Sequence, residues 1–155
     1  MPRQLWLLRH GEAEPHGSRP DDDRALTPRG EDQSRSAGRA LAALGLTFQA
    51  VYTSPKVRAR DTAMLACEAL GVTPVEHGPL RGDFGGRSAL ELLRDHAEDD
   101  RLLLVGHNPD LPQVVADLAG GRVDMKKGGV AGLRVNGAAA DLIVLLRPRE
   151  LDRIG

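Results

Sequence analysis

Two histidines in this chain stand where short apolar segments end. Residues 5–8 run into Arg9 and His10, and residues 102–105 lead to His107. A neutral imidazole is a nucleophile and a proton carrier near neutral pH. An arginine beside it can hold an anion through its forked N–H donors. These residue types therefore suit the transfer of a negatively charged group, and a phosphoryl group fits them best.

A second arginine and several main-chain amides extend the predicted anion pocket. Arg58 lies in the first turn of a predicted helix, and the amides at Gly11 and at helix starts are further donors. A divalent metal fits less well, because two guanidiniums repel a cation and no third histidine or converging carboxylate stands at ligand spacing. We therefore predict attack by one imidazole at phosphorus, with the arginines and the other histidine on the phosphoryl oxygens and with no metal.

Length and composition limit the class of protein. The chain has 155 residues, which fits one domain over residues 1–155 with an extensive core. Its formal net charge of −1 disfavours a nucleic-acid partner, and its single cysteine excludes a disulfide framework. No apolar run approaches the roughly 20 residues of a membrane span, and the first residues do not resemble a signal peptide. We expect a cytoplasmic protein with no membrane partner.

Strand and helix patterns alternate along most of the chain. Short apolar runs predict strands buried on both faces, and the segments between them carry helical spacing. Thr27 as an N-cap followed by Pro28 is a clear helix start. The predicted strands cover residues 5–8, 50–53, 73–76 and 101–105, and the predicted helices cover residues 28–44, 55–70, 89–96 and 111–118.

The last part of the chain differs from this alternation. Residues 128–135 and 142–146 are typical of two strands joined by a turn at Asn136-Gly137. The earlier strands are expected to be parallel, with right-handed crossovers. The predicted fold is α/β, a three-layer α/β/α sandwich whose mainly parallel sheet ends in an antiparallel hairpin. The carboxyl ends of parallel strands share one edge of the sheet. This edge should bring together Arg9, His10, Arg58, His107 and Asn108.

Residues 13–25 have no hydrophobic period and are predicted to form a loop over the mouth of this crevice. The loop contains three consecutive aspartates at positions 21–23. Consecutive carboxylates in a loop do not converge on one ion, so we predict a solvated turn here rather than a metal site.

Four spaced motifs resemble those of the histidine phosphatase superfamily, which has the phosphoglycerate mutase-like fold. They are Arg9-His10-Gly11, Leu26-Thr27-x-x-Gly30, Ser54-Pro55-x-x-Arg58-Ala59-x-x-Thr62-Ala63 and Gly106-His107-Asn108-Pro109. Their order along the chain is that of the family, and the resemblance extends from Leu5 to about Leu118. The short chain and the run Arg9-His10-Gly11-Glu12-Ala13-Glu14 look like the small phosphohistidine phosphatases of the SixA type.

The resemblance implies a role for each matching residue. His10 matches the nucleophile that is phosphorylated, Arg9 and Arg58 match the arginines that bind phosphate, and His107 matches the second histidine of the pocket. Gly11 matches the glycine that lets the chain turn beneath the phosphate. Asn108 follows the pocket histidine, where only a main-chain contact is expected. The family reaction needs neither a metal nor another cofactor.

One departure from the family pattern concerns the proton donor. Many members carry a glutamate in a leucine-x-glutamate pattern after the third strand, whereas Leu80-Arg81-Gly82 has glycine there. Asp83 and Glu76 are the nearest candidates for a general acid. A phosphohistidine on a protein is the predicted substrate, and a small phosphorylated metabolite such as a sugar phosphate is the alternative. A phosphate-binding module without turnover is a further reading, which the intact His10 disfavours.

Overall fold

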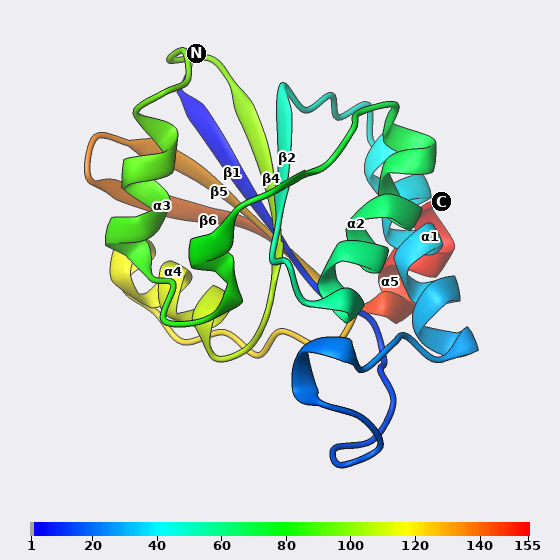
Figure 1. The fold of residues 1–155 in the computed structure, drawn as a ribbon. Helices are drawn as coiled ribbons and strands as arrows, with labels where there is room; N and C mark the ends of the chain where they lie inside the picture. Colours follow the sequence, from blue (N-terminus) through cyan, green and yellow to red (C-terminus); the bar gives the residue numbers. More distant parts are fainter. Residues whose placement is uncertain (1) are drawn as a thin grey trace.

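The computed structural model describes residues 2–155. Its centre is one six-stranded sheet with the order β3-β2-β4-β1-β5-β6 (Figure 1). No helix within residues 2–155 is long and apolar enough to cross a bilayer. The strands are β1 (Arg3–Arg9), β2 (Ala50–Thr53), β3 (Val75–Glu76), β4 (Arg101–Gly106), β5 (Val130–Asn136) and β6 (Ala139–Leu146).

The parallel part of the sheet and the hairpin at its edge are both confirmed. Strand β4 pairs in parallel with β1 and with β2, and β2 pairs in parallel with β3. Strand β5 runs antiparallel to β1 and to β6. The hairpin is longer than predicted, because Asn136 still pairs with Ala139 and the two-residue turn is Gly137-Ala138. Gly137 has a φ of +63°, a left-handed conformation that glycine adopts without strain. The second strand therefore begins at Ala139, not at residue 142.

Helices cover both faces of the sheet, which gives the predicted three layers (Figure 1). One face is covered by α1 (Pro28–Ala43), α2 (Val57–Leu70) and α5 (Pro148–Ile154), and the other by α3 (Gly86–Leu93) and α4 (Asp110–Ala119). Successive residues of a strand point to opposite faces. Accordingly, Trp6 and Leu8 of β1 are buried against the first set of helices, and Leu5 and Leu7 against the second.

The helix-start signal at Thr27 is confirmed, whereas the bounds of one predicted helix need correction and one helix was not predicted. The Thr27 side chain accepts a hydrogen bond from the Gly30 amide at 3.1 Å. Helix α3 covers residues 86–93 instead of 89–96, because Ser88 Oγ accepts the Gly85 amide and the helix starts there. Helix α5 has no predicted counterpart, although Pro148 at its first position is a start signal.

The carboxyl ends of β1, β2 and β4 meet at one edge of the sheet, as predicted. The chain leaves β1 through Gly11, which packs directly on the start of α1. A Cβ atom on Gly11 would lie 2.5 Å from the carbonyl oxygen of Gly30, so a larger residue would force β1 and α1 apart. This contact fixes the position of the chain next to His10.

Candidate active site

His10 and His107 lie side by side at the carboxyl edge of the sheet. They follow the neighbouring strands β1 and β4, in which Arg9 is paired with Gly106. The His10 amide donates to the Gly106 carbonyl oxygen at 3.0 Å, which continues the pairing by one residue. The centroids of the two rings are 5.2 Å apart. Both side chains are almost fully buried.

The hydrogen bond of His10 determines which ring nitrogen is free. Its Nδ1 lies 2.7 Å from the main-chain oxygen of Gly11. A carbonyl oxygen can only accept, so Nδ1 carries the proton and Nε2 keeps its lone pair. Burial lowers the pKa of His10 to about 3, and the charges of Arg58 and Arg9 act in the same direction. His10 therefore offers an unprotonated Nε2 at neutral pH, as a nucleophile requires.

His107 is positioned by Ser54, the residue that follows β2. Its Nε2 lies 2.8 Å from Ser54 Oγ, and Ser54 Oγ accepts a hydrogen bond from the Lys56 amide at 3.2 Å. Burial lowers the pKa of His107 to about 4, and the positive charge of Arg58 adds to this effect. The motif that carries Ser54 was recognised in the sequence, but its contact with His107 was not predicted. This contact links the ends of β2 and β4.

The two arginines are held by carbonyl oxygens of different segments. Arg9 donates from Nη1 to the Met125 carbonyl oxygen at 2.9 Å. Arg58 is buried and donates from Nη1 to the Asp21 carbonyl oxygen at 2.7 Å, while its Nη2 lies 3.3 Å from Asp21 Oδ2. A guanidinium has five N–H groups. Asp21 uses two of them on Arg58, so three stay available for an anion.

Three buried polar atoms without a hydrogen-bond partner belong to residues of this site. Among residues 2–155, four buried side-chain nitrogens or oxygens have no hydrogen-bond partner, namely Arg3 Nε, Arg9 Nε, Arg58 Nε and His107 Nδ1. Buried polar groups are almost always paired in folded proteins. Three of these four nitrogens belong to residues that the sequence assigned to one anion pocket. Their grouping is what a site built for phosphoryl oxygens requires.

Gly11 and Asn108 lie at the site but contact other protein groups. The Gly11 amide donates to Thr62 Oγ1 at 3.1 Å, so the expectation that it is a free donor to phosphate is not met. Thr62 Oγ1 in turn donates to the Arg58 carbonyl oxygen at 2.7 Å, which joins the end of β1 to α2. The side chain of Asn108 donates to the Met125 carbonyl oxygen at 3.2 Å.

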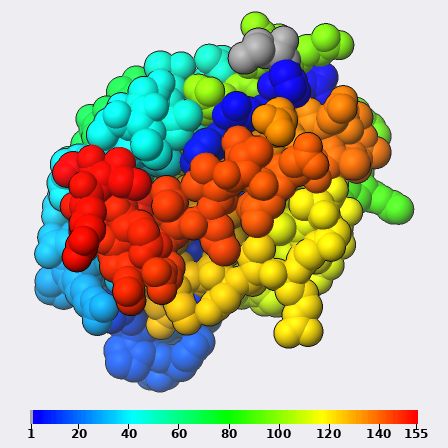
Figure 2. All heavy atoms as spheres, turned by 180° about the vertical axis from the view of Figure 1, so that it is seen from behind, coloured from blue at the N-terminus to red at the C-terminus, as the bar shows by residue number. Residues whose placement is uncertain are grey.

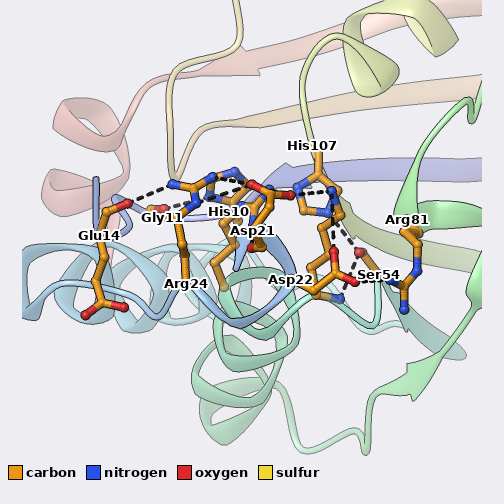
Figure 3. Close-up of polar contacts among 11 residues, drawn as sticks. His10, Gly11, Glu14, Asp21, Asp22, Arg24, Ser54, Arg81 and His107 are labelled. Atoms are coloured by element: carbon orange, nitrogen blue, oxygen red, sulfur yellow. Dashed lines mark hydrogen bonds and ion pairs between the residues drawn. The ribbon is translucent and has the colours of Figure 1, made fainter. Parts of the chain in front are cut away.

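The three aspartates in the loop were predicted to form a solvated turn, and Asp21 and Asp23 are indeed exposed, but Asp21 also makes ion pairs that were not predicted. They form the short 3₁₀ turn η1 (Asp21–Asp23), whose Asp22 lies beside Arg81 in Figure 3, and Asp21 contacts Arg58. Lys56 and Arg24 hold the pKa of the Asp21 carboxyl well below its usual range. The Lys56 ammonium lies 2.8 Å from Asp21 Oδ2 and the Arg24 guanidinium 2.9 Å from Oδ1. Asp22 pairs with Arg81. Asp21 and Lys56 are site residues that the sequence reading missed.

The candidate proton donors differ in their surroundings. Glu76 is exposed at the end of β3, the edge strand. Asp83 is also exposed, and among residues 2–155 it is the only non-glycine residue with a positive φ, at 57°. Its charge raises the pKa of Asp110, on which burial has the larger effect in the same direction. Asp110 begins α4 just after His107 and accepts the Phe84 amide at 3.3 Å. Because Asp83 precedes Phe84 in the chain, the carboxyl groups of Asp83 and Asp110 lie in the same part of the molecule, close to the His107 turn.

The lowered pKa of His10 predicts how stability depends on pH. Free histidine titrates near pH 6.5, so below that pH the unfolded chain binds a proton that folded His10 refuses until about pH 3. The free energy of unfolding should therefore fall as the pH decreases from 6.5. Between pH 7 and pH 5, His10 should account for about 1–2 kcal/mol of this fall. Urea unfolding at both pH values checks this.

The same experiment on His10→Ala isolates the contribution of the ring. The variant should lose correspondingly less stability between pH 7 and pH 5 than the wild type. His16→Ala, which removes an exposed histidine, shows the effect of a histidine substitution away from the pocket. An equally steep loss in His10→Ala and in the wild type would contradict the assignment of a neutral, buried His10.

The side chains of this site do not form a metal-binding group. Within residues 2–155, no three His, Cys, Asp or Glu side chains come together in a way that could hold a metal ion. Most of the charged groups that act on the histidines are instead cations, namely Arg9, Arg58 and Lys56, and the Asp21 carboxylate opposes them at His107. Such a setting attracts an anion.

The sequence matches a known family across more than half of its length. The profile of the histidine phosphatase superfamily (branch 1) matches residues 5–87. An uncharacterized protein from Picosynechococcus sp. is 39% identical over 163 residues, which cover 96% of this chain and 98% of that protein.

Two solved structures share the fold over nearly all of the chain. The protein histidine phosphatase SixA in complex with tungstate superimposes with a TM-score of 0.85 and 23% identity, covering 96% of this chain and 99% of that one. Phosphoserine phosphatase from Entamoeba histolytica with 3-phosphoglyceric acid gives a TM-score of 0.76 and 15% identity, with the same coverage. At these identities the matches show a common fold. The family profile shows that this chain belongs to the histidine phosphatase superfamily (branch 1), and the chain is a phosphatase enzyme.

Proposed function

We propose that this phosphatase removes the phosphoryl group from phosphohistidine on a protein, through a phosphorylated His10. One observation carries the mechanism: the free Nε2 of His10 lies in a pocket where Arg9, Arg58 and His107 each have a buried nitrogen without a partner. Three donors around one nucleophile suit a phosphoryl group, whose charge spreads over three oxygens during transfer.

The reaction then has two steps. His10 Nε2 attacks phosphorus, the N–P bond of the substrate breaks, and the leaving imidazole takes the electron pair and a proton. Water then attacks the phosphorus on His10, the new N–P bond breaks, and inorganic phosphate leaves while the proton of the water passes to solvent. Arg9, Arg58 and His107 hold the phosphoryl oxygens in both steps. Thr62 and Ser54 keep the pocket residues in place.

The substrate assignment rests on the leaving group. An alkyl phosphate releases an alkoxide, and its departure depends on a placed proton donor, which typically contributes about 10²–10⁴-fold. When the imidazole of a phosphohistidine is protonated, it leaves as a neutral ring as the N–P bond breaks. Free histidine is protonated near pH 6.5, so solvent can supply this proton. Gly82 stands where many family members have a glutamate. The absence of a carboxyl at this position favours phosphohistidine.

A direct comparison of substrates tests the proposal. We expect kcat/KM for a phosphohistidine protein to exceed that for simple alkyl phosphates by at least about 10²-fold, the low end of the usual contribution of a general acid. Asp83→Asn should leave kcat/KM for phosphohistidine within about threefold of the wild-type value, because departure of imidazole does not need this carboxyl. Ser88→Ala, a polar substitution in the same part of the chain, serves as the control variant.

A phosphomonoesterase acting on a small metabolite is the second candidate function. The carboxyl groups of Asp83 and Asp110 favour it, because burial and the neighbouring charge raise the pKa of Asp110 and so promote its protonated, donating form. In this case an alkyl phosphate would be the better substrate. Its turnover would fall sharply in Asp83→Asn or Asp110→Asn, and this result would overturn the phosphohistidine assignment.

A further inference from the structure

A second cationic site lies next to Arg9, outside the group formed by His10, Arg58 and His107. It is a pocket of about 480 Å³ between the start of α1, the segment before β5 and the start of α5. Figure 2 shows these three segments meeting on one side of the molecule, coloured light blue, golden yellow and orange-red. We call it the basic pocket, after the cations that line it: Arg9, Arg29, Lys126, Lys127, Arg147 and Arg149.

The lining of the basic pocket has an excess of positive charge, although the chain as a whole is nearly neutral. The whole protein has a formal net charge of −1, yet six cations and one carboxylate, Glu12, line this hollow. Carboxylates offset part of this charge: Glu12 lies 3.7 Å from Arg29, Asp124 lies 2.9 Å from Lys126, and Glu150 is shared between Arg147 at 2.8 Å and Arg149 at 3.5 Å. A concave surface lined by one sign of charge concentrates the field and attracts counter-ions.

Arg9 connects the basic pocket to the active site. Its guanidinium lines the pocket, and its Nη1 is held by the carbonyl oxygen of Met125, the residue before Lys126. Its Nε is buried without a partner. A group bound in the basic pocket therefore lies beside the arginine that is assigned to the transferring phosphoryl group. A substrate that carries a second anionic group, besides the phosphoryl group, can therefore bind in the basic pocket and in the active site at the same time.

We propose that the basic pocket binds acidic side chains that flank the phosphohistidine on the protein substrate. This inference rests on the proposed function and adds a preference for the sequence around the phosphorylated residue. The cations at the rim, Lys127 and Arg149 among them, are exposed and belong to long, flexible side chains. Such side chains adapt to carboxylates at variable positions along a protein segment. A small bisanionic metabolite has the same chemistry, and the experiment separates the two sources.

The test reverses two charges in the basic pocket. Lys127→Glu/Arg149→Glu is compared with Arg39→Glu/Arg94→Glu, which makes the same change in net charge at exposed arginines on α1 and next to α3. Substrates are a phosphohistidine peptide flanked by glutamates and the same peptide flanked by glutamines. For the glutamate peptide, we expect a roughly tenfold lower kcat/KM in the pocket variant and a change of under about twofold in the control. The loss should shrink in about 0.5 M salt, which screens exposed charges.

The remaining arms decide between the outcomes. A loss confined to the glutamate peptide supports the proposal, whereas equal losses on both peptides, or none, overturn it. A small phosphate ester that carries a carboxylate is compared with its carboxamide analogue. If kcat/KM of the pocket variant falls only for this carboxylate ester and not for the glutamate peptide, the pocket does not serve a protein substrate. Lys127→Gln/Arg149→Gln repeats the test if the reversed variant melts at a lower temperature.

Equilibrium binding separates this proposal from the proposed function. The unphosphorylated glutamate peptide is titrated into wild type and pocket variant, and binding is followed by fluorescence anisotropy. Weaker binding to the variant supports the basic pocket even if the wild type fails to hydrolyse phosphohistidine. Equal binding overturns the pocket even if hydrolysis is rapid.

Discussion

Replacing His10 by alanine should reduce turnover by at least about 10⁴-fold, because the variant has no atom that can accept the phosphoryl group. The fold should survive, since the ring makes one hydrogen bond, to the Gly11 carbonyl oxygen of the adjoining residue. The strand pairing of β1 uses main-chain atoms only. Arg9 and Arg58 remain, so the variant should still bind inorganic phosphate.

The acid lability of the phosphoenzyme shows directly whether the phosphoryl group is bound to nitrogen. Rapid mixing of the wild type with labelled substrate, followed by a quench in base, should yield a phosphoenzyme whose label is lost in acid, as expected of an N–P bond. His10→Ala should yield none, and His16→Ala, which removes an exposed histidine, should match the wild type. Normal turnover by a folded His10→Ala protein would remove His10 from the mechanism and with it the covalent pathway.

Replacing Arg58 by lysine should cost about 2–3 kcal/mol of transition-state stabilisation, which is roughly a 30- to 150-fold loss in kcat/KM. An ammonium keeps the charge but loses the planar fork. In this protein the fork has two tasks, because Nη1 and Nη2 hold Asp21 while the buried Nε and the remaining hydrogens are free for phosphate. One ammonium cannot reproduce both sets of contacts from the same position.

The control for this substitution is Arg60→Lys, an exposed arginine two residues further along α2. It makes the same chemical change outside the pocket and should keep kcat/KM within about twofold of the wild-type value. A near-normal rate for Arg58→Lys would place Arg58 outside the phosphoryl-binding group. A loss in the melting temperature comparable with that of a core substitution would instead assign Arg58 to holding the η1 turn.

The placement of the main site residues followed from the sequence because each is tied to a regular element. The apolar runs before His10 and His107 predict strands, and the signals at Thr27 and at Ser54-Pro55 predict the helices that follow. Parallel pairing then carries the ends of these strands to one edge. Local patterns of this kind are enough to predict where the site residues lie in the fold, but they do not specify what each side chain contacts.

The contacts that the sequence did not reveal are between segments far apart along the chain. Asp21 contacts Arg58 across 37 positions, and the Gly11 amide contacts Thr62 across 51. A run of aspartates has the same local pattern whether it is solvated or paired, so only the tertiary arrangement shows that Asp21 meets a buried cation. Residues 147–155 had a readable start signal in Pro148, but a seven-residue helix is too short for a convincing period.

The central position of β1 in the sheet also determines when the protein can first become active. This strand precedes the other five strands along the chain, and its two neighbours, β4 and β5, begin only at Arg101 and Val130. Both edges of β1 therefore stay unpaired until β4 and β5 have been synthesised, and unpaired strand edges expose a nascent chain to aggregation. His10 is therefore synthesised well before the two strands that flank β1, and the sheet around it can close only after Asn136, the last residue of β5, has been added.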